Sequence, residues 1–189
     1  MNRPRPPHRS EPSPSPPPSP AAPPSPPPGP APAPVPGTGA EATAADREWL
    51  ERAIALSWKC PPSQTAFSVG AIVVDVRGAV VTDGYSRRDD PHDHAEEAAL
   101  RAVDPGDPRL VGATVYSSLE PCTRRASRVR SCTRLILDTR ISRVVFAWRE
   151  PEIFVNGEGA EELRLAGRTV VEVPDLAHRV REVNEHLLR

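Results

Sequence analysis

Three side chains that suit a zinc ion lie far apart in the sequence: His94, Cys122 and Cys132. Zinc favours nitrogen and sulfur ligands in a tetrahedron, and a catalytic site leaves one of the four positions open. One histidine and two cysteines supply three ligands and leave that position for water. A zinc ion lowers the pKa of such a water toward neutrality. The residues therefore predict a catalytic Zn2+ site.

Glu96 lies two residues after His94, at the start of an expected helix. Its carboxylate can take a proton from the water and later hand it to a leaving amine. The order H-x-E, then P-C, then a second C is typical of zinc-dependent deaminases. We therefore predict a hydrolytic deaminase in which Glu96 is the catalytic proton carrier.

Two other interpretations of the same residues stay open. A structural zinc site would need a fourth protein ligand, which His92 or Cys60 could supply. The second interpretation is a zinc-bearing interaction module without catalytic activity, whose Pro-rich N-terminus recruits partners. Glu96 argues against both, because neither gives the carboxylate a role.

Hydrophobic spacing and turn residues predict the elements that must position these side chains. Helices are expected at 46–59, 94–103, 132–139, 160–166 and 175–188, and strands at 69–76, 79–83, 113–119, 143–148 and 169–173. His94 and Cys132 would each open a helix, and Cys122 would follow a strand. Alternating helices and strands predict an α/β fold with a mixed sheet and helices on both faces.

Residues 1–40 differ in composition from the rest of the chain, with proline runs separated by serine and alanine. Such a segment buries too little apolar surface to offset its ordering entropy, so it is predicted to be a disordered tail. Residues 41–189 are predicted to form the zinc-dependent deaminase domain.

The composition restricts the cellular location and the classes of binding partner that are expected. The net charge of −1 gives no indication of nucleic-acid binding, and arginine supplies 23 of the 24 basic residues, so an arginine cluster is weak evidence by itself. Three cysteines suggest a reducing compartment rather than a disulfide framework. No apolar run is long enough to span a membrane, and the N-terminus lacks the apolar core of a secretory signal. We expect a cytoplasmic protein.

The sequence resembles the cytidine deaminase-like superfamily, and within it the deaminase domain of the bifunctional riboflavin-biosynthesis deaminase-reductases. The likeness rests on Val69-Gly70-Ala71-Ile72-Val73, His94-Ala95-Glu96, Leu119-Glu120-Pro121-Cys122 and the long gap before Cys132. It implies a three-layer α/β/α sandwich with about five strands, and a homodimer or homotetramer. It also implies removal of a ring amino group from a phosphoribosylamino-pyrimidine, with His94, Cys122 and Cys132 as ligands and Glu96 as proton shuttle.

The sequence departs from that pattern at two places that bear on the substrate. Ala66-Phe67-Ser68 stands where these proteins usually carry Asn-Pro, and the loop between the cysteines is one residue longer and lacks their His-x-Gly-Arg-Thr character. Deamination of deoxycytidylate, cytidine or a nucleoside antibiotic therefore stays an alternative. A nucleic-acid substrate is the least favoured.

Arginines between the two cysteines are candidates for binding a substrate phosphate, because guanidinium groups match phosphate oxygens. Arg124, Arg125 and Arg128 are the candidates, and Arg128 aligns best with the loop arginine of the resembled family. Tyr85 is a fourth candidate, since the resemblance places its segment at the pocket. The alternative is a solvated loop in an arginine-rich protein.

Overall fold

A computed structural model describes residues 41–149 and 158–188. The helices are α1 Ala44–Ser57, α2 Ala95–Arg101, α3 Cys132–Leu137, α4 Gly159–Leu165 and α5 Ala177–Val183. The strands are β1 Gly70–Val74, β2 Val80–Tyr85, β3 Thr114–Leu119, β4 Arg143–Trp148 and β5 Thr169–Glu172. The predicted order of helices and strands is confirmed, with bounds that shift by a few residues. The tail predicted for residues 1–40 lies outside the described residues.

The sheet has five strands in the order β2-β1-β3-β4-β5. Strand β1 is antiparallel to both β2 and β3, whereas β3, β4 and β5 run parallel. The tight connection between β1 and β2 uses Gly78, whose φ of 81° is in the left-handed region that glycine adopts without strain. The expected mixed sheet is confirmed.

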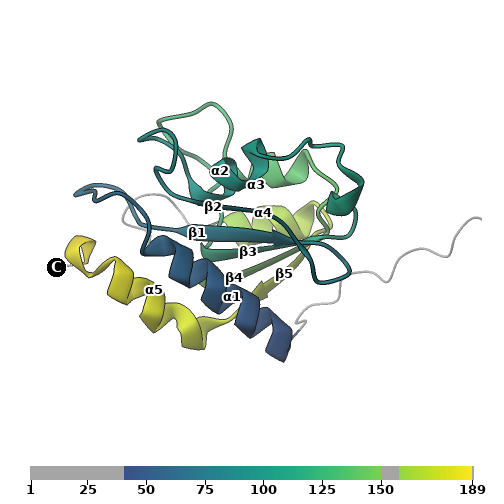
Figure 1. Ribbon diagram of the computed structural model, residues 1–189, viewed down its shortest axis with the longest axis horizontal. Helices are drawn as coiled ribbons and strands as arrows, with labels where there is room; N and C mark the ends of the chain where they lie inside the picture. Colours follow the sequence, from purple (N-terminus) through teal and green to yellow (C-terminus); the bar gives the residue numbers. More distant parts are fainter. Residues whose placement is uncertain (1–40, 150–157, 189) are drawn as a thin grey trace, which may run out of the picture. The chain divides into compact units, whose positions relative to one another are not determined.

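Helices cover both faces of the sheet, as Figure 1 shows. Helices α1 and α5 pack on one face, where Leu50, Ile54 and Val180 meet side chains such as Val145. Helices α2, α3 and α4 cover the other face, where residues such as Ile136 are buried. Alternate residues of β4 enter the two cores, as the pleat of a strand requires. This is the three-layer α/β/α sandwich expected from the sequence.

Helix α1 begins with a capping box. The Thr43 side chain accepts from the Asp46 backbone N–H, and the Asp46 carboxylate accepts from the Thr43 N–H. The same carboxylate is buried against the Arg143 guanidinium and the Tyr116 hydroxyl. These contacts fix the start of α1 against β3 and β4.

The last helix is shorter than the sequence predicts. Instead of one helix over 175–188, α5 ends at Val183, and 3-10 turns precede and follow it. Asn184 is the C-cap of α5, and its side chain joins the end of the helix to the segment before β1. Its Oδ1 accepts from the Ser68 N–H at 2.7 Å, and its Nδ2 donates to the carbonyl oxygens of Ser68 and Val180. None of the helices in 41–149 and 158–188 is long and apolar enough to cross a membrane.

Candidate active site

Three elements bring the predicted zinc ligands together at one end of the sheet. His94 is the residue before α2, Cys122 follows β3 by three residues, and Cys132 begins α3. Ser131 caps α3 by accepting from the Arg134 N–H, and the Thr133 N–H donates to the Cys122 carbonyl oxygen. These contacts hold the two cysteine backbones side by side.

The donor atoms have the spacing that a zinc ion requires. The Nδ1 atom of His94 lies 3.5 Å from the Sγ of Cys122 and 3.5 Å from the Sγ of Cys132. Zinc bonds of about 2.3 Å to sulfur and about 2.0 Å to nitrogen, at tetrahedral angles, put the two kinds of atom about 3.5 Å apart. All three donor atoms lie within 4.8 Å of one another, and neither His92 nor Cys60 belongs to this cluster. The residues fit a zinc ion held by three ligands.

The two cysteines ionise unequally. A hydrogen bond from the Cys132 thiol, opposed by burial and aided by His94, lowers the pKa of Cys122 to about 4. The same hydrogen bond, together with burial and the nearby Glu96 carboxylate, raises the pKa of Cys132 well above its ordinary value. One thiolate is therefore present at neutral pH, and zinc binding would release the proton of the second.

Glu96 lies beside the ligand cluster with one oxygen already engaged. The side chain is 3% exposed, and its Oε1 atom accepts a hydrogen bond of 2.6 Å from the Ser117 hydroxyl of β3. Ser117 is fully buried, so the Glu96 carboxylate is held in place by β3 and not by solvent. The same carboxylate lies beside the Cys132 thiol and lines the cavity, where it can reach reacting groups.

A cavity of about 490 Å³ opens onto these residues, a volume that suits a small molecule. Its walls come from four segments: the loop before β1, the loop after β2, the end of β3 and the loop between the cysteines. The lining residues include Thr65, Ala66, Phe67, Ser86, Arg87, His92, Asp93, His94, Glu96, Glu120, Cys122, Arg124, Arg125 and Ser127. A ligand in this cavity would contact both the zinc site and Glu96.

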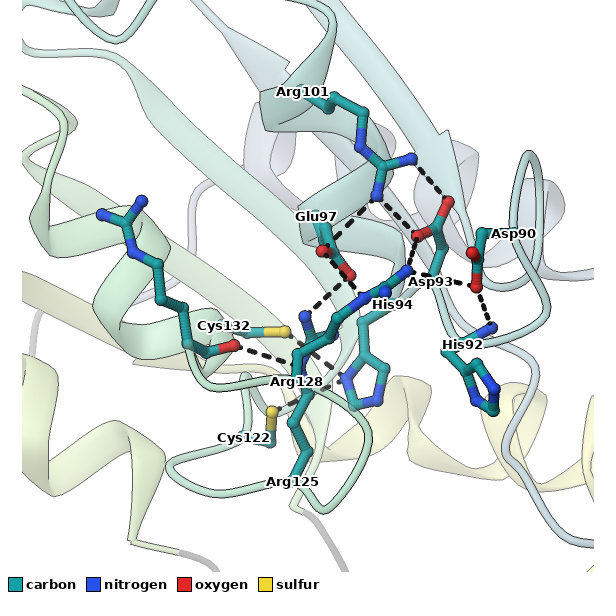
Figure 2. Close-up of polar contacts among 11 residues, drawn as sticks. Asp90, His92, Asp93, His94, Glu97, Arg101, Cys122, Arg125, Arg128 and Cys132 are labelled. Carbon is teal, nitrogen blue, oxygen red and sulfur yellow. Dashed lines mark hydrogen bonds and ion pairs between the residues drawn. The ribbon is translucent and has the colours of Figure 1, made fainter.

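The predicted arginines between the cysteines divide into two groups. Arg124 and Arg125 line the cavity, whereas Arg128 does not. Figure 2 shows the Arg128 guanidinium turned to acidic side chains, where it pairs with Asp90 at 3.1 Å and Asp93 at 3.4 Å. These carboxylates lie before α2, so Arg128 ties the loop to the segment that carries His94.

Arg125 is buried against the same acidic cluster but keeps an unused donor. Its side chain is 4% exposed, its Nη2 atom lies 2.7 Å from a Glu97 carboxylate oxygen, and its Nε donates to the Arg130 carbonyl oxygen (Figure 2). The Nη1 atom is buried and has no hydrogen-bond partner among the described residues. A buried donor without a partner is costly, so a ligand oxygen is a natural partner for it.

Comparison with known families agrees with this geometry. Residues 43–148, more than half of the chain, match the cytidine and deoxycytidylate deaminase zinc-binding region. The chain belongs to this deaminase family. The matched range contains all three zinc ligands and Glu96, and the Zn2+ cofactor predicted from the sequence is confirmed for this family.

Relatives within the deaminase family carry names from riboflavin synthesis. A diaminohydroxyphosphoribosylamino-pyrimidine deaminase of Schizosaccharomyces pombe is 42% identical over 127 residues, which cover 66% of this chain and 31% of that protein. The deaminase/reductase structure of Thermotoga maritima has a TM-score of 0.66 at 30% identity, covering 76% of this chain and 40% of that one. The Aspergillus oryzae Rib2 deaminase in complex with DARIPP has a TM-score of 0.64 at 27% identity, covering 74% and 90%. The chain matches about a third of the length of its curated relatives.

Tyr85 does not line the cavity of this deaminase domain. It is the last residue of β2, and its ring lies 5.8 Å from the Arg88 guanidinium. His92 lines the cavity, whereas Cys60 does not, and its thiol donates to the Val69 carbonyl oxygen. Neither supplies the fourth ligand that a structural zinc site would need.

Two residues that sequence reasoning missed are part of the site. Ser117 was expected only as a strand residue, although its hydroxyl bonds to Glu96. Arg87 lines the cavity and has a φ of 64°, unusual for a residue other than glycine. The strand pattern indicates which face Ser117 occupies, but no pattern in the sequence indicates the backbone conformation of Arg87.

Proposed function

We propose that this chain is a zinc-dependent hydrolytic deaminase that removes a ring amino group from a pyrimidine nucleotide of the riboflavin pathway. The observation that carries the proposal is the convergence of His94, Cys122 and Cys132 beside a buried Glu96 at a cavity of small-molecule size. The names of the most similar relatives support the substrate class.

The reaction assigned to the site is hydrolysis of a C–N bond, with water entering and ammonia leaving. Zinc, held by His94, Cys122 and Cys132, supplies the Lewis acidity that makes water reactive at neutral pH. The Glu96 carboxylate, which Ser117 holds in place, takes the proton of the attacking water and delivers it to the departing amine. Burial of Glu96 excludes bulk water from this exchange.

Recognition of an anionic substrate is assigned to Arg125 and Arg124. Arg125 offers a buried, unpaired Nη1 atom at the cavity, and Arg124 lines the same wall. Arg128, the strongest candidate in the sequence, is neutralised by carboxylates and serves to hold the loop in this proposal. Tyr85 has no part in the proposed contacts, since it lies outside the cavity lining.

The second candidate is deamination of another nucleotide or nucleoside, such as deoxycytidylate, cytidine or a nucleoside antibiotic. The observation that favours it is the wall formed by Ala66 and Phe67, which stand where the resembled enzymes usually carry Asn-Pro. A different wall beside the ring-binding site can select a different ring. The shared zinc chemistry would be unchanged.

The test is ammonia release from a panel that contains the diaminopyrimidine ribosylamino phosphate, its dephosphorylated form, deoxycytidylate and cytidine. We expect the diaminopyrimidine phosphate to be the best substrate of the full chain loaded with zinc. Preference for deoxycytidylate or cytidine would establish the second candidate instead. Absence of ammonia from every member, with about one zinc ion per folded chain, would favour the non-catalytic interaction module.

Assembly and location belong to the same proposal. We infer a homodimer or homotetramer in the cytoplasm, supported by the resemblance and by three free cysteines, which suit a reducing compartment. No nucleic-acid partner is proposed, because acidic side chains offset the arginines of the intercysteine loop. Light scattering of the purified chain would measure the assembly.

A further inference from the structure

Arg87 is a buried cation that no carboxylate pairs with in the described part of the chain. Its residue is 9% exposed, and burial lowers the pKa of its guanidinium. Three other arginines near the site, Arg101, Arg125 and Arg128, each pair with a carboxylate. A buried charge without an opposite charge is costly, and such groups gather at functional sites.

The Arg87 guanidinium instead donates four hydrogen bonds to neutral acceptors of one loop. Nε donates to the Pro61 carbonyl oxygen at 3.0 Å, and Nη1 donates to the carbonyl oxygens of Ala66 and Phe67 at 3.2 and 2.9 Å. Nη2 donates to the Ser68 hydroxyl at 2.9 Å. Four bonds to one eight-residue loop need the planar fork of arginine, which lysine lacks.

The loop that Arg87 holds, residues 61–68, forms a wall of the cavity through Thr65, Ala66 and Phe67. It contains no regular strand or helix, so few backbone contacts of its own fix its shape. Asn184 and His186 anchor its outer side at Ser68 and Ser63. Arg87 lies on the cavity side.

The backbone of Arg87 also departs from ordinary conformations. Its φ of 64° places it in the left-handed region, where a side chain other than glycine is strained. Such strain persists when surrounding contacts outweigh it, and it concentrates at functional sites. The four side-chain bonds, together with the bond from the Arg87 N–H to the Asp93 carbonyl oxygen, provide those contacts.

We propose that Arg87 is a positioning residue that shapes the 61–68 wall of the cavity and thereby sets the fit of the substrate. The part of this inference that concerns the substrate rests on the proposed function. The contacts between Arg87 and the loop do not depend on it. Arg87 acts through Thr65, Ala66 and Phe67, because four of its five N–H donors are taken up by the 61–68 loop. Its role therefore lies in binding rather than in the proton transfer assigned to Glu96.

The test compares Arg87→Lys and Arg87→Met with the matched control Arg88→Met in the zinc-loaded full chain. Arg88 is the adjacent residue, pairs with Asp83 near the surface and does not line the cavity. Both Arg87 variants are expected to raise KM about tenfold while kcat changes less than about threefold, with zinc retained. The Arg88 variant should match the wild type.

Hydrogen exchange followed by mass spectrometry gives a readout that needs no substrate. Both Arg87 variants should speed exchange in the peptide covering 61–68 and leave the peptide covering α2 unchanged, whereas Arg88→Met should change neither. Wild-type exchange over 61–68 in both Arg87 variants would overturn the proposal. So would full retention of the wild-type KM in Arg87→Lys, because charge alone would then suffice. If the wild type deaminates nothing on the panel, the proposed function fails, and the exchange comparison still decides the role of Arg87.

Discussion

Buried polar groups lie at both ends of the parallel strands β3 and β4, and the two ends use them differently. At the amino ends, Asp46 receives hydrogen bonds from Thr43, Tyr116 and Arg143 and is 2% exposed. Every oxygen of this carboxylate is used within the protein. The group joins α1 to the sheet and has no access to the cavity.

At the carboxyl ends, comparable groups line the cavity. Glu96 is held there by Ser117, and Arg125 keeps a buried Nη1 atom without a hydrogen-bond partner. The Asp46 network thus serves stability, whereas the site end carries the cost of incomplete bonding. The comparison teaches that burial and charge alone do not mark a functional residue in this chain: Glu96 and Arg125 also line the cavity, which Asp46 does not.

The comparison is tested most strongly at Glu96. Glu96→Gln keeps the size of the side chain and removes its ability to carry a proton, so we expect turnover to fall by about 10³-fold or more. Zinc content and the urea midpoint should stay at wild-type values. Ammonia release and metal analysis on the same sample measure both, and near wild-type turnover would remove Glu96 from its assigned role.

The opposite result is expected at Asp46. Asp46→Asn leaves the partly buried Arg143 without its charge partner, which should lower the free energy of unfolding by about 3 kcal/mol. Urea unfolding measures the loss. Glu51→Gln breaks an exposed ion pair with Arg179 and should cost less than about 1 kcal/mol. Folded Asp46→Asn should retain the wild-type KM, and a selective loss of activity would contradict the division between the two ends.

The pH dependence of stability gives a second measure of the Asp46 network. Burial opposes ionisation, but the Arg143 and Thr43 hydrogen bonds prevail and lower the pKa of Asp46 from 3.8 to about 2. A depressed pKa contributes stability that is full above 3.8 and is lost as the pH falls through 2. Between pH 5 and pH 2 the wild type should therefore lose about 2 kcal/mol more than Asp46→Asn. Parallel unfolding curves for the two proteins over that range would contradict the assignment.

The loop arginines sharpen the comparison within the site itself. Arg125→Met should lower kcat/KM about tenfold for the phosphorylated substrate and less for its dephosphorylated form. Arg128→Met removes the same charge from a side chain that pairs with Asp90 and Asp93 and does not line the cavity, so any loss should be equal for both substrates. A phosphate-selective loss in Arg128→Met alone would restore Arg128 as the substrate contact.

The amino-acid types and their order were sufficient to predict the sandwich and the convergence of His94, Cys122 and Cys132. Strand and helix periodicity placed His94 and Cys132 at helix starts and Cys122 after a strand, and the structure has them there. These predictions succeed because ligand chemistry restricts residue type, and because hydrophobic periodicity is a local property of the chain.

The loop contacts could not be predicted in the same way. Arg125 and Arg128 are alike in sequence, and the acidic groups that distinguish them come from another element. Asn184 lies within a helical pattern, yet its side chain bonds to Ser68, which is 116 residues earlier. In each case the decisive partner is distant in sequence, so only the folded chain selects it.

Removal of residues 1–40 should have the smallest effect on activity and stability, because this segment belongs to neither end of the strands. All contacts used above, at Asp46 and at Glu96, are made among residues 43–186. The Pro-rich composition of 1–40 predicts no packed core. The shortened chain should therefore keep the kcat and KM of the full chain. Its free energy of unfolding should stay within about 0.5 kcal/mol of the full chain's value. A clear rise in KM would mean that the N-terminal segment takes part in substrate binding, and the site would then extend beyond the two ends of the strands.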